Sequence, residues 1–241
     1  MIRTFFIVVC SLISTVILGI VSLGSSFFTK TGNFSHLVSR LWSKSILFVS
    51  GVNVTITGMS NIDPEKAFIY MPNHQSNFDI PVLLGCLPIQ FRWLAKAEVF
   101  KTPILGRSMK VSGYISIDRS NRESAIESLN QVTETIQKGI SVVIFPEGTR
   151  SKDGKLKSFK KGGFVIAVDS GIPIVPVIIY DTWEIMPKNS LLIKPRNVLM
   201  EIKEPVETTG YSRQTKDQLM DEIKNIIADS LQRRQGKNKD V

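Results

Sequence analysis

The first thirty positions of the chain are dominated by hydrophobic residues. No charged residue occurs from Thr4 to Thr29, and Arg3 and Lys30 flank this run. As a helix, the run would extend about 36 Å or more, which is enough for the core of a bilayer. A cleaved signal peptide is the main alternative, but the run is longer than a usual signal core and no clear cleavage site follows it. The pattern therefore predicts a membrane segment.

Small hydroxyl side chains form one face of this predicted helix. At helical spacing they lie opposite the large apolar residues, so this face is expected to pack against another helix or to lie toward lipid headgroups. The residues of the hydroxyl face are Ser11, Ser14, Thr15, Ser22, Ser25 and Ser26.

Residues 34–48 have the pattern of a second, amphipathic helix, which is too short and too charged to span a bilayer. Its position beside the uncharged run favours a helix at the membrane interface, although an ordinary amphipathic helix on a soluble core has the same pattern. The apolar face consists of Phe34, Leu37, Val38, Leu41, Leu47 and Phe48, with Trp42 at its border, and the polar face of His36, Ser39, Arg40, Ser43 and Lys44. Residues 1–50 are thus predicted to form a two-helix membrane anchor with Phe34, Leu37, Leu41 and Trp42 as its contacts. Its charged residues are all basic, which suits an anionic leaflet and a cytoplasmic face.

Beyond residue 50, short apolar runs alternate with helical patterns. Strands are expected at 66–71, 90–95, 112–117, 141–145, 172–179 and 198–203, and helices at 80–86, 121–138 and 214–234. This alternation predicts an α/β domain over residues 51–241, built on a mixed, mostly parallel sheet flanked by helices and ending in a basic tail. Ser120 and Glu123 are expected to form a capping box, and Pro173 and Pro176 indicate an edge position or an irregular end for their strand.

The charge balance narrows the classes of partner. The 241 residues carry a net charge of +9, which predicts attraction to nucleic acid, anionic lipid or phosphorylated substrates. Nucleic-acid binding would require a basic helix or an aromatic platform in the soluble part, and the sequence has neither. Two cysteines and two histidines make neither a disulfide framework nor a metal knuckle, so no metal is expected.

Polar residues follow three of the predicted strands, in the stretches "NHQSNFD", "DRSNR" and "PEGTRS". If the sheet is parallel there, all three stretches meet at one edge, where active sites of such sheets lie. His74 is a candidate general base, and Asp79 could receive its far ring N–H if the chain turns between a strand and a helix. A nucleophile of the protein is missing from the usual places, which suggests that His74 activates a substrate hydroxyl. A capped turn with a satisfied histidine is the alternative.

The stretch from Pro146 to Arg150 exposes a glycine, a hydroxyl and a guanidinium where a buried strand ends. These groups are suited to bind phosphate, and Arg119 offers a second guanidinium. Each arginine alone is more often a solvated surface charge. Their shared location favours the phosphate site.

Four ordered stretches, "NHQSNFD", "GYISIDR", "FPEGTRS" and "IPIVPV", resemble the sequence blocks of the glycerophospholipid acyltransferases, especially the 1-acyl-glycerol-3-phosphate acyltransferases of the PlsC type. The resemblance spans about residues 58–205. It implies transfer of a fatty acyl group from acyl carrier protein or coenzyme A to the sn-2 hydroxyl of lysophosphatidic acid, with no metal or other cofactor. Together with the basic N-terminal segment, this places the expected catalytic domain on the cytoplasmic face of the cell membrane.

The resemblance also implies roles for individual residues. In the HX4D motif, His74 would be the base and Asp79 its orienting partner. Arg119 would bind the acceptor phosphate, and Glu147, Gly148, Thr149 and Arg150 would complete that pocket. Another lysolipid or glycerol-3-phosphate as acceptor stays open, as does a non-catalytic lipid-binding protein on the same fold.

Overall fold

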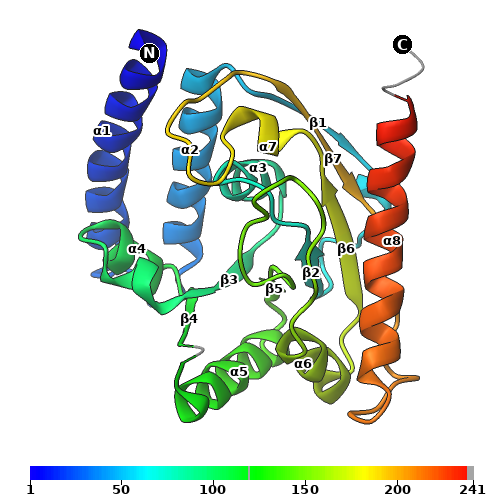
Figure 1. Cartoon of the computed structure of the whole chain (residues 1–241). Coiled ribbons are helices and arrows are strands. Elements are labelled where there is room, and N and C mark those ends of the chain that lie inside the picture. Colours follow the sequence, from blue (N-terminus) through cyan, green and yellow to red (C-terminus); the bar gives the residue numbers. More distant parts are fainter. Residues whose placement is uncertain (119, 238–241) are drawn as a thin grey trace.

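The centre of the molecule is a twisted seven-stranded sheet (Figure 1). The computed structural model describes residues 1–118 and 120–237. In the sheet the strand order is β1-β7-β6-β2-β5-β3-β4; β6 and β7 pair antiparallel, and all other neighbours pair parallel. The expected mixed, mostly parallel sheet is confirmed. Its strands are β1 Asn53–Thr57, β2 Ile69–Pro72, β3 Phe91–Lys96, β4 Ile115–Ile117, β5 Ser141–Val143, β6 Ile174–Ile179 and β7 Asn197–Ile202.

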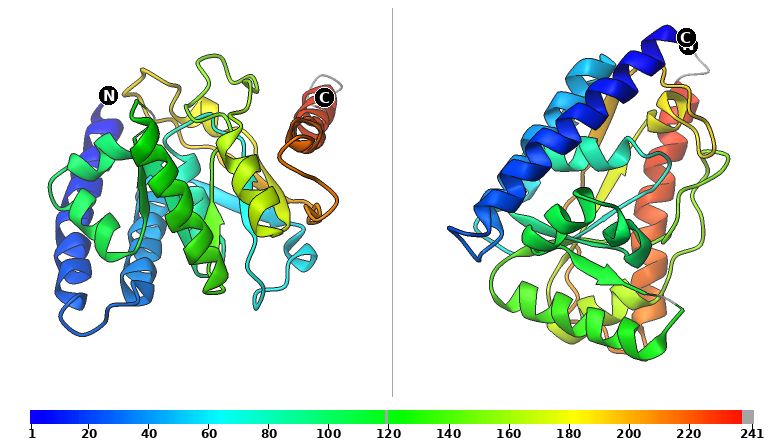
Figure 2. Two further views of the ribbon diagram at one scale, coloured as in Figure 1. Left: turned by 90° about the horizontal axis from the view of Figure 1, so that it is seen from below. Right: turned by 90° about the vertical axis from the view of Figure 1, so that its left-hand side faces the viewer.

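Helices cover both faces of this sheet (Figure 2). They are α1 Ile2–Ser25, α2 Asn33–Ser50, α3 Asp79–Cys86, α4 Leu105–Val111, α5 Arg122–Gln137, α6 Gly162–Ser170, α7 Thr182–Ile185 and α8 Lys216–Lys237, with 3₁₀ turns η1 Met59–Asn61 and η2 Ala97–Lys101. Because successive strand residues point to opposite faces, Tyr70 packs into the core on the α2 and α3 side, whereas Ile69 and Met71 pack into the core formed with α5, α6 and α8.

The hydroxyl face of α1 packs against α2, as the sequence predicts. Ser14 Oγ lies 2.8 Å from Ser45 Oγ, and the indole N–H of Trp42 donates to Thr15 Oγ1 at 2.9 Å. Ser22 and Ser35 also form a hydrogen bond. Small side chains allow two helices to approach closely, and their hydroxyl groups bond across the contact. The two N-terminal helices therefore lie side by side (Figures 1 and 2).

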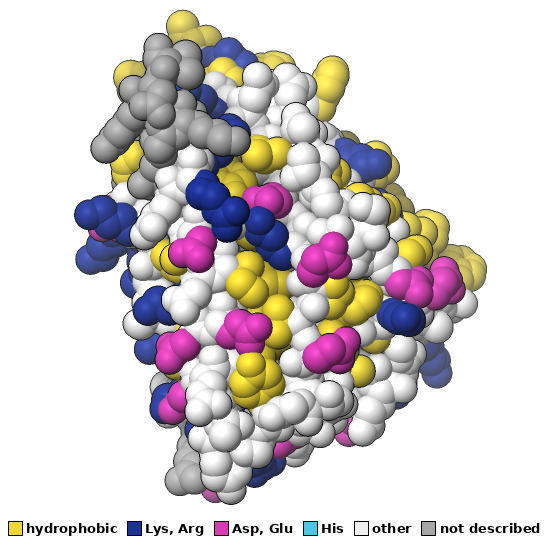
Figure 3. All heavy atoms as spheres, turned by 90° about the vertical axis from the view of Figure 1, so that its right-hand side faces the viewer, with side chains coloured by type: hydrophobic (Ala, Val, Ile, Leu, Met, Phe, Trp, Pro, Cys, Tyr) yellow, Lys and Arg dark blue, Asp and Glu magenta, His cyan; other side chains and the backbone are white. Residues whose placement is uncertain are grey.

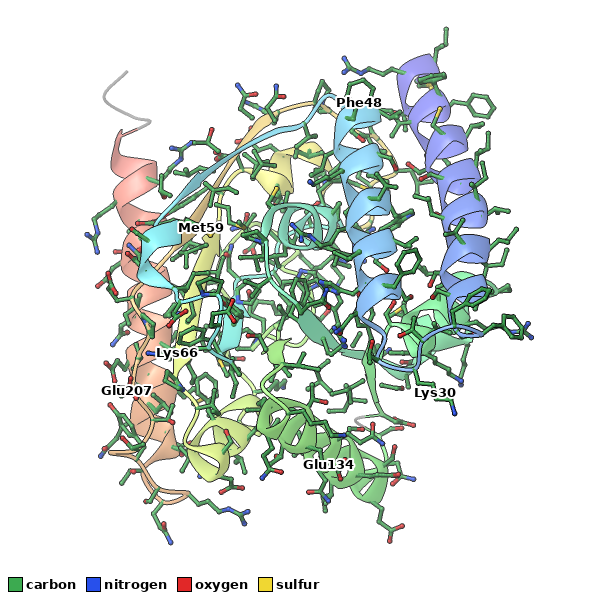
Figure 4. The ribbon with its side chains drawn as sticks, turned by 180° about the vertical axis from the view of Figure 1, so that it is seen from behind. Lys30, Phe48, Met59, Lys66, Glu134 and Glu207 are labelled. Carbon is green, nitrogen blue, oxygen red and sulfur yellow. The ribbon has the colours of Figure 1, made fainter. Side chains whose placement is uncertain are left out.

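Large apolar side chains of both N-terminal helices point outward. Phe34, Leu37, Leu41 and Phe48 of α2 are exposed, and Figure 4 shows Phe48 near the end of α2, beside α1. On α1 the exposed residues include Ile2, Phe5, Phe6, Leu12, Ile13, Ile17 and Ile20. By length and composition, α1 is the one helix of the described chain that could cross a membrane. An outward apolar surface of this kind suits a lipid environment.

The predicted polar face of α2 is wrong in part. His36 and Ser43 are buried, and His36 Nδ1 lies 3.1 Å from Tyr114 Oη. Conversely, Val38 and Leu47 of the predicted apolar face point inward and are buried. The helix contacts the α/β domain on one side, so its polar residues find partners in the protein there and its outer apolar residues do not.

Some local expectations need correction. Helix α5 is capped by Asn121, whose Oδ1 accepts from the backbone N–H of Glu123 and Ser124, whereas Ser120 bonds to Asp118. The strand that contains Pro176 is interior rather than at an edge. It can be interior because its ladder with β7 begins only at Val177. The sequence patterns also missed β1, α4, α6 and α7, which are short.

The opposite flank of the molecule has a different surface. Over α8, acidic and basic side chains are scattered between hydrophobic ones (Figure 3). Mixed charges of this kind are typical of a face in contact with water. The exposed apolar residues of α1 and α2 thus give the molecule an apolar side, and α8 lies on a side of mixed charge.

Candidate active site

His74 and Asp79 meet at the carboxyl end of the sheet. Strand β2 ends at Pro72, the chain turns, and Asp79 is the first residue of α3. His74 Nδ1 lies 2.8 Å from Asp79 Oδ2, and the Asp79 side chain is completely buried. The predicted strand-to-helix turn is confirmed. However, the N-cap of α3 is Phe78, whose side chain has no oxygen to cap the helix, and the Asp79 carboxylate faces back into the turn.

The Asp79 carboxylate is held by three further donors. Its Oδ2 accepts from the backbone N–H of Gln75 at 2.7 Å and of Ser76 at 2.8 Å. Its Oδ1 accepts from the hydroxyl of Thr182, at the start of α7. A carboxylate fixed in this way accepts the Nδ1–H of His74 and leaves the Nε2 lone pair available as a base.

The imidazole of His74 is also fixed by stacking. Its ring lies 3.8 Å from the ring of Phe145 at an interplanar angle of 16°, and Phe145 in turn stacks on Trp93 at 5.5 Å. Only 12% of the His74 side chain is exposed. Stacking and the Asp79 bond together restrict both the plane and the rotation of the ring.

Glu147 holds the backbone of His74. Its Oε1 accepts from the His74 N–H at 2.7 Å, and its Oε2 accepts from the Lys157 N–H at 2.9 Å. The carboxyl is buried, and this burial raises its pKa to about 7 despite the two hydrogen bonds. Ser151 N–H donates to the carbonyl of His74 at 2.9 Å. The geometry makes Glu147 a positioning residue, and its contact with the acceptor stays a prediction.

The segment after Glu147 brings cationic groups to the site. Gly148 adopts φ +71°, which favours glycine, and it lines the same cavity as His74. Lys188 Nζ donates to Thr149 Oγ1 at 3.3 Å and lies 3.5 Å from the Arg150 carbonyl oxygen. Desolvation and then the charges of Lys157, Arg150 and Lys152 lower the pKa of Lys188. Arg119, the other predicted phosphate ligand, lies outside the described residues.

The side chains of these cations lack an ion-pair partner in the part of the chain that the structure describes. Neither Arg150 nor Lys188 forms an ion pair there, and the same holds for Lys152 and Lys157. A group of cations without counter-charges attracts an anion.

An apolar cavity of about 240 Å³ adjoins His74. It lies between the N-terminal helices and the sheet, and Trp42 of the predicted anchor is part of its wall rather than a purely outward contact. Its lining consists of Thr15, Leu18, Gly19, Val38, Ser39, Trp42, His74, Ile80, Leu84, Trp93, Leu94, Ala95, Lys96, Val99, Leu105, Ser108, Met109, Tyr114, Phe145 and Gly148. Mostly apolar walls, with His74, Lys96 and Tyr114 as the titratable residues of the lining, suit a long hydrocarbon chain with a reactive end.

The sequence patterns missed three residues that build this site. Asn73 joins the ends of β2 and β6, since its side chain accepts from Ile179 N–H at 2.7 Å and donates to Ile179 O at 2.9 Å. Thr182 and Lys188 follow β6. The polar stretch "YDTWE" after that strand was the signal for Thr182, because it too lies where a parallel strand ends. Across residues 1–118 and 120–237, no group of three or more potential metal ligands was found.

Fold and site define a class of protein: an α/β domain that holds a His–Asp pair where parallel strands end, beside an apolar cavity. Comparison with known proteins narrows this class. The acyltransferase family profile matches residues 53–180, more than half of the chain, so the chain belongs to the acyltransferase family.

Individual relatives agree with this assignment. The chain is 34% identical, over 94% of its length, to "1-acyl-sn-glycerol-3-phosphate acyltransferase LPAT1, chloroplastic" of Arabidopsis thaliana, and 36% identical, over 82%, to the BAT2 protein of that name in Brassica napus. It spans 64% and 56% of those relatives. The crystal structure of the 1-acyl-sn-glycerophosphate acyltransferase PlsC from Thermotoga maritima superimposes with a TM-score of 0.83 at 27% identity, covering 97% of this chain and 95% of that one.

Proposed function

We propose that this protein transfers a fatty acyl group from an acyl thioester to the sn-2 hydroxyl of 1-acyl-glycerol-3-phosphate, which gives phosphatidic acid. One observation carries the proposal: His74, bonded to Asp79, lines an apolar cavity together with Gly148, and Arg150 and Lys188, which form no ion pair among the described residues, lie beside Thr149. A base between a hydrocarbon site and an anion site fits a lipid acceptor with a phosphate head. The relatives named for this reaction support the same conclusion.

The proposed reaction begins at His74 Nε2. It takes the proton of the acceptor hydroxyl while that oxygen forms a bond to the thioester carbonyl carbon, and Asp79 stabilises the imidazolium through Nδ1. The tetrahedral oxyanion then collapses, the C–S bond breaks, and the thiolate leaves with the proton from Nε2. The ester and the free thiol are the products, and the histidine returns to its starting state.

The acceptor phosphate binds, in this account, at the cations beside Thr149. Arg150 and Lys188 supply charge, the Thr149 hydroxyl donates a hydrogen bond, and Arg119 is the further ligand expected from the sequence. Glu147 supports this segment by accepting hydrogen bonds from the backbone N–H groups of Lys157 and His74. The acyl donor is a thioester of acyl carrier protein or coenzyme A, and no cofactor takes part.

The exposed apolar residues of the N-terminal helices support a site at a membrane. Lysophosphatidic acid and long acyl chains reside in the bilayer, and the exposed apolar residues of α1 and α2 bind there while the cavity opens between these helices and the sheet. Net charge of +9 favours an anionic surface. We propose that the protein acts at the cytoplasmic face of the cell membrane.

A direct assay tests the proposal. Purified protein is incubated with lysophosphatidic acid and either acyl-ACP or acyl-CoA, and phosphatidic acid is measured; glycerol-3-phosphate and lysophosphatidylcholine serve as alternative acceptors. The proposal expects phosphatidic acid with at least one donor and far less product from the other acceptors. Binding of lysophosphatidic acid without product from either donor would instead indicate a lipid-binding protein.

A further inference from the structure

Two leucines project from a loop of the α/β domain, outside the two N-terminal helices. The α7–β7 loop, residues 186–196, carries Leu191 with 82% and Leu192 with 43% of its surface exposed. The next residue, Ile193, is buried in the core on the α2 and α3 side. An exposed pair of leucines beside a buried isoleucine is a costly arrangement in water.

The loop is held firmly, so these leucines do not simply belong to a disordered turn. Lys194 N–H donates to Ile185 O at 2.9 Å, and Leu192 N–H donates to Ser190 Oγ at 3.1 Å. Inside the loop, Ser190 N–H donates to Pro187 O at 3.0 Å. Backbone bonds of this kind fix the direction in which Leu191 and Leu192 point.

The loop is joined to the first helix. Ile193 N–H donates to Thr4 Oγ1 at 3.2 Å, and the side chains of Arg3 and Pro195 both approach Gly51 at the end of α2. The exposed leucines therefore lie at the end of the molecule where the N-terminus of α1 and the C-terminus of α2 meet. The exposed Phe48 of α2 lies at this end as well (Figure 4).

The charges of the loop indicate what covers its leucines. The loop contains Lys188, Lys194 and Arg196 and no acidic residue, and Arg196 forms an ion pair with Glu184 of α7. Lys194 is exposed and has no ion pair among the residues described by the structure. Apolar side chains flanked by cations are the composition that binds the headgroup region of an anionic bilayer.

We propose that the α7–β7 loop inserts Leu191 and Leu192 into the bilayer interface as a third membrane contact, in addition to α1 and α2. The inference rests on the proposed function only for its consequence. The loop contains Lys188, which bonds to Thr149, so docking of the loop holds the acceptor site at the height of lipid headgroups. An acceptor can then enter without leaving the membrane.

Site-specific labelling tests the insertion independently of catalysis. Leu191→Cys is labelled with an environment-sensitive fluorophore in the full chain, with Cys10→Ser and Cys86→Ala removing the native thiols, and reconstituted into vesicles containing phosphatidylglycerol. Ile126→Cys on α5 is the matched control, because Ile126 is also an exposed apolar residue, at 49%. Brominated lipid should quench the label at position 191 and not the label at position 126. Iodide, which stays in water, should quench the label at position 191 at least about threefold less than the label at position 126.

Equal quenching at the two positions would overturn the proposal. So would a spectral shift at position 191 that appears on raising the protein concentration without vesicles, since this would show a second copy of the chain on the loop.

A kinetic experiment tests whether membrane contact of the loop helps the acceptor to reach the site. The double variant Leu191→Ser, Leu192→Ser should raise the KM for a long-chain acceptor in vesicles severalfold, and this increase should be larger than that caused by Ile126→Ser. The KM for a short-chain soluble acceptor should stay unchanged. An unchanged vesicle KM would contradict a role in substrate access. If the unsubstituted protein makes no phosphatidic acid, the proposed function fails, whereas the quenching result still decides the membrane contact.

Discussion

The backbone N–H of His74 donates to Glu147 Oε1 at 2.7 Å, so a buried carboxyl from the loop after β5 holds the residue that follows β2. The two loops are 73 positions apart in the sequence and meet because β2 and β5 are parallel neighbours. The position of the proposed base therefore depends on a residue that need not touch substrate.

Glu147 gives the stability of the protein a specific pH dependence. Its pKa is raised from 4.5 to about 7 in the folded state, because burial disfavours the charged form. The stability that it contributes is therefore complete below pH 4.5 and is lost as the pH rises through 7. The loss is about 3 kcal/mol.

Glu147→Gln is the control, because glutamine does not titrate. We expect the free energy of unfolding of the native protein, relative to this variant, to fall as the pH rises from about 5 to about 8. Chemical unfolding at a series of pH values measures this difference. Parallel stability curves for the two proteins would show that Glu147 has no raised pKa.

Asp79→Asn removes the charge next to His74 and keeps the shape of the side chain. We expect turnover to fall at least about 100-fold, because the imidazolium loses its counter-charge and the ring its tautomer. Thr182→Val should cost less, since Asp79 keeps its two backbone donors. Initial rates and thermal unfolding of both variants separate catalysis from folding. A folded Asp79→Asn protein with nearly native turnover would remove the carboxylate from the mechanism.

Lys188→Gln tests the cationic site for the acceptor phosphate. We expect the acceptor KM to rise about tenfold with little change in kcat, because the variant loses a charge-assisted hydrogen bond to the phosphate whose strength is limited by partial exposure. Salt should weaken acceptor binding less in the variant than in the native protein. Lys138→Gln, an exposed lysine after α5, is the matched control. An equal acceptor KM in both variants would place the phosphate elsewhere.

Much of the sheet could be predicted from sequence because most of its strands are largely apolar runs bounded by polar residues. The short elements β1 and α7 escaped prediction because hydrophobic periodicity is ambiguous over so few residues. Helix α2 was predicted as a helix, yet the inward positions of His36 and Ser43 depend on partners such as Tyr114, which lies far away in the sequence. Periodicity marks apolar and polar faces and does not reveal which polar residues find buried partners.

The His–Asp pair could be predicted because both residues lie within one turn. The hydrogen bonds of Glu147 and Thr182 could not be predicted, since each residue bonds to a segment that is distant in sequence. The order of β6, β2 and β5 in the sheet brings these segments together. The assignment of the acceptor phosphate to Arg119 stays a prediction, as that residue lies outside the described residues.

Turnover by His74→Ala tests the central claim most directly. The substitution leaves the Glu147 and Ser151 bonds to the backbone of residue 74 in place, so the fold and the cationic site should remain. We predict a loss of at least about 100-fold in kcat, with acceptor affinity close to that of the native protein. A folded variant that retains most of its turnover would contradict the account, because the acceptor hydroxyl would then lose its proton to another group.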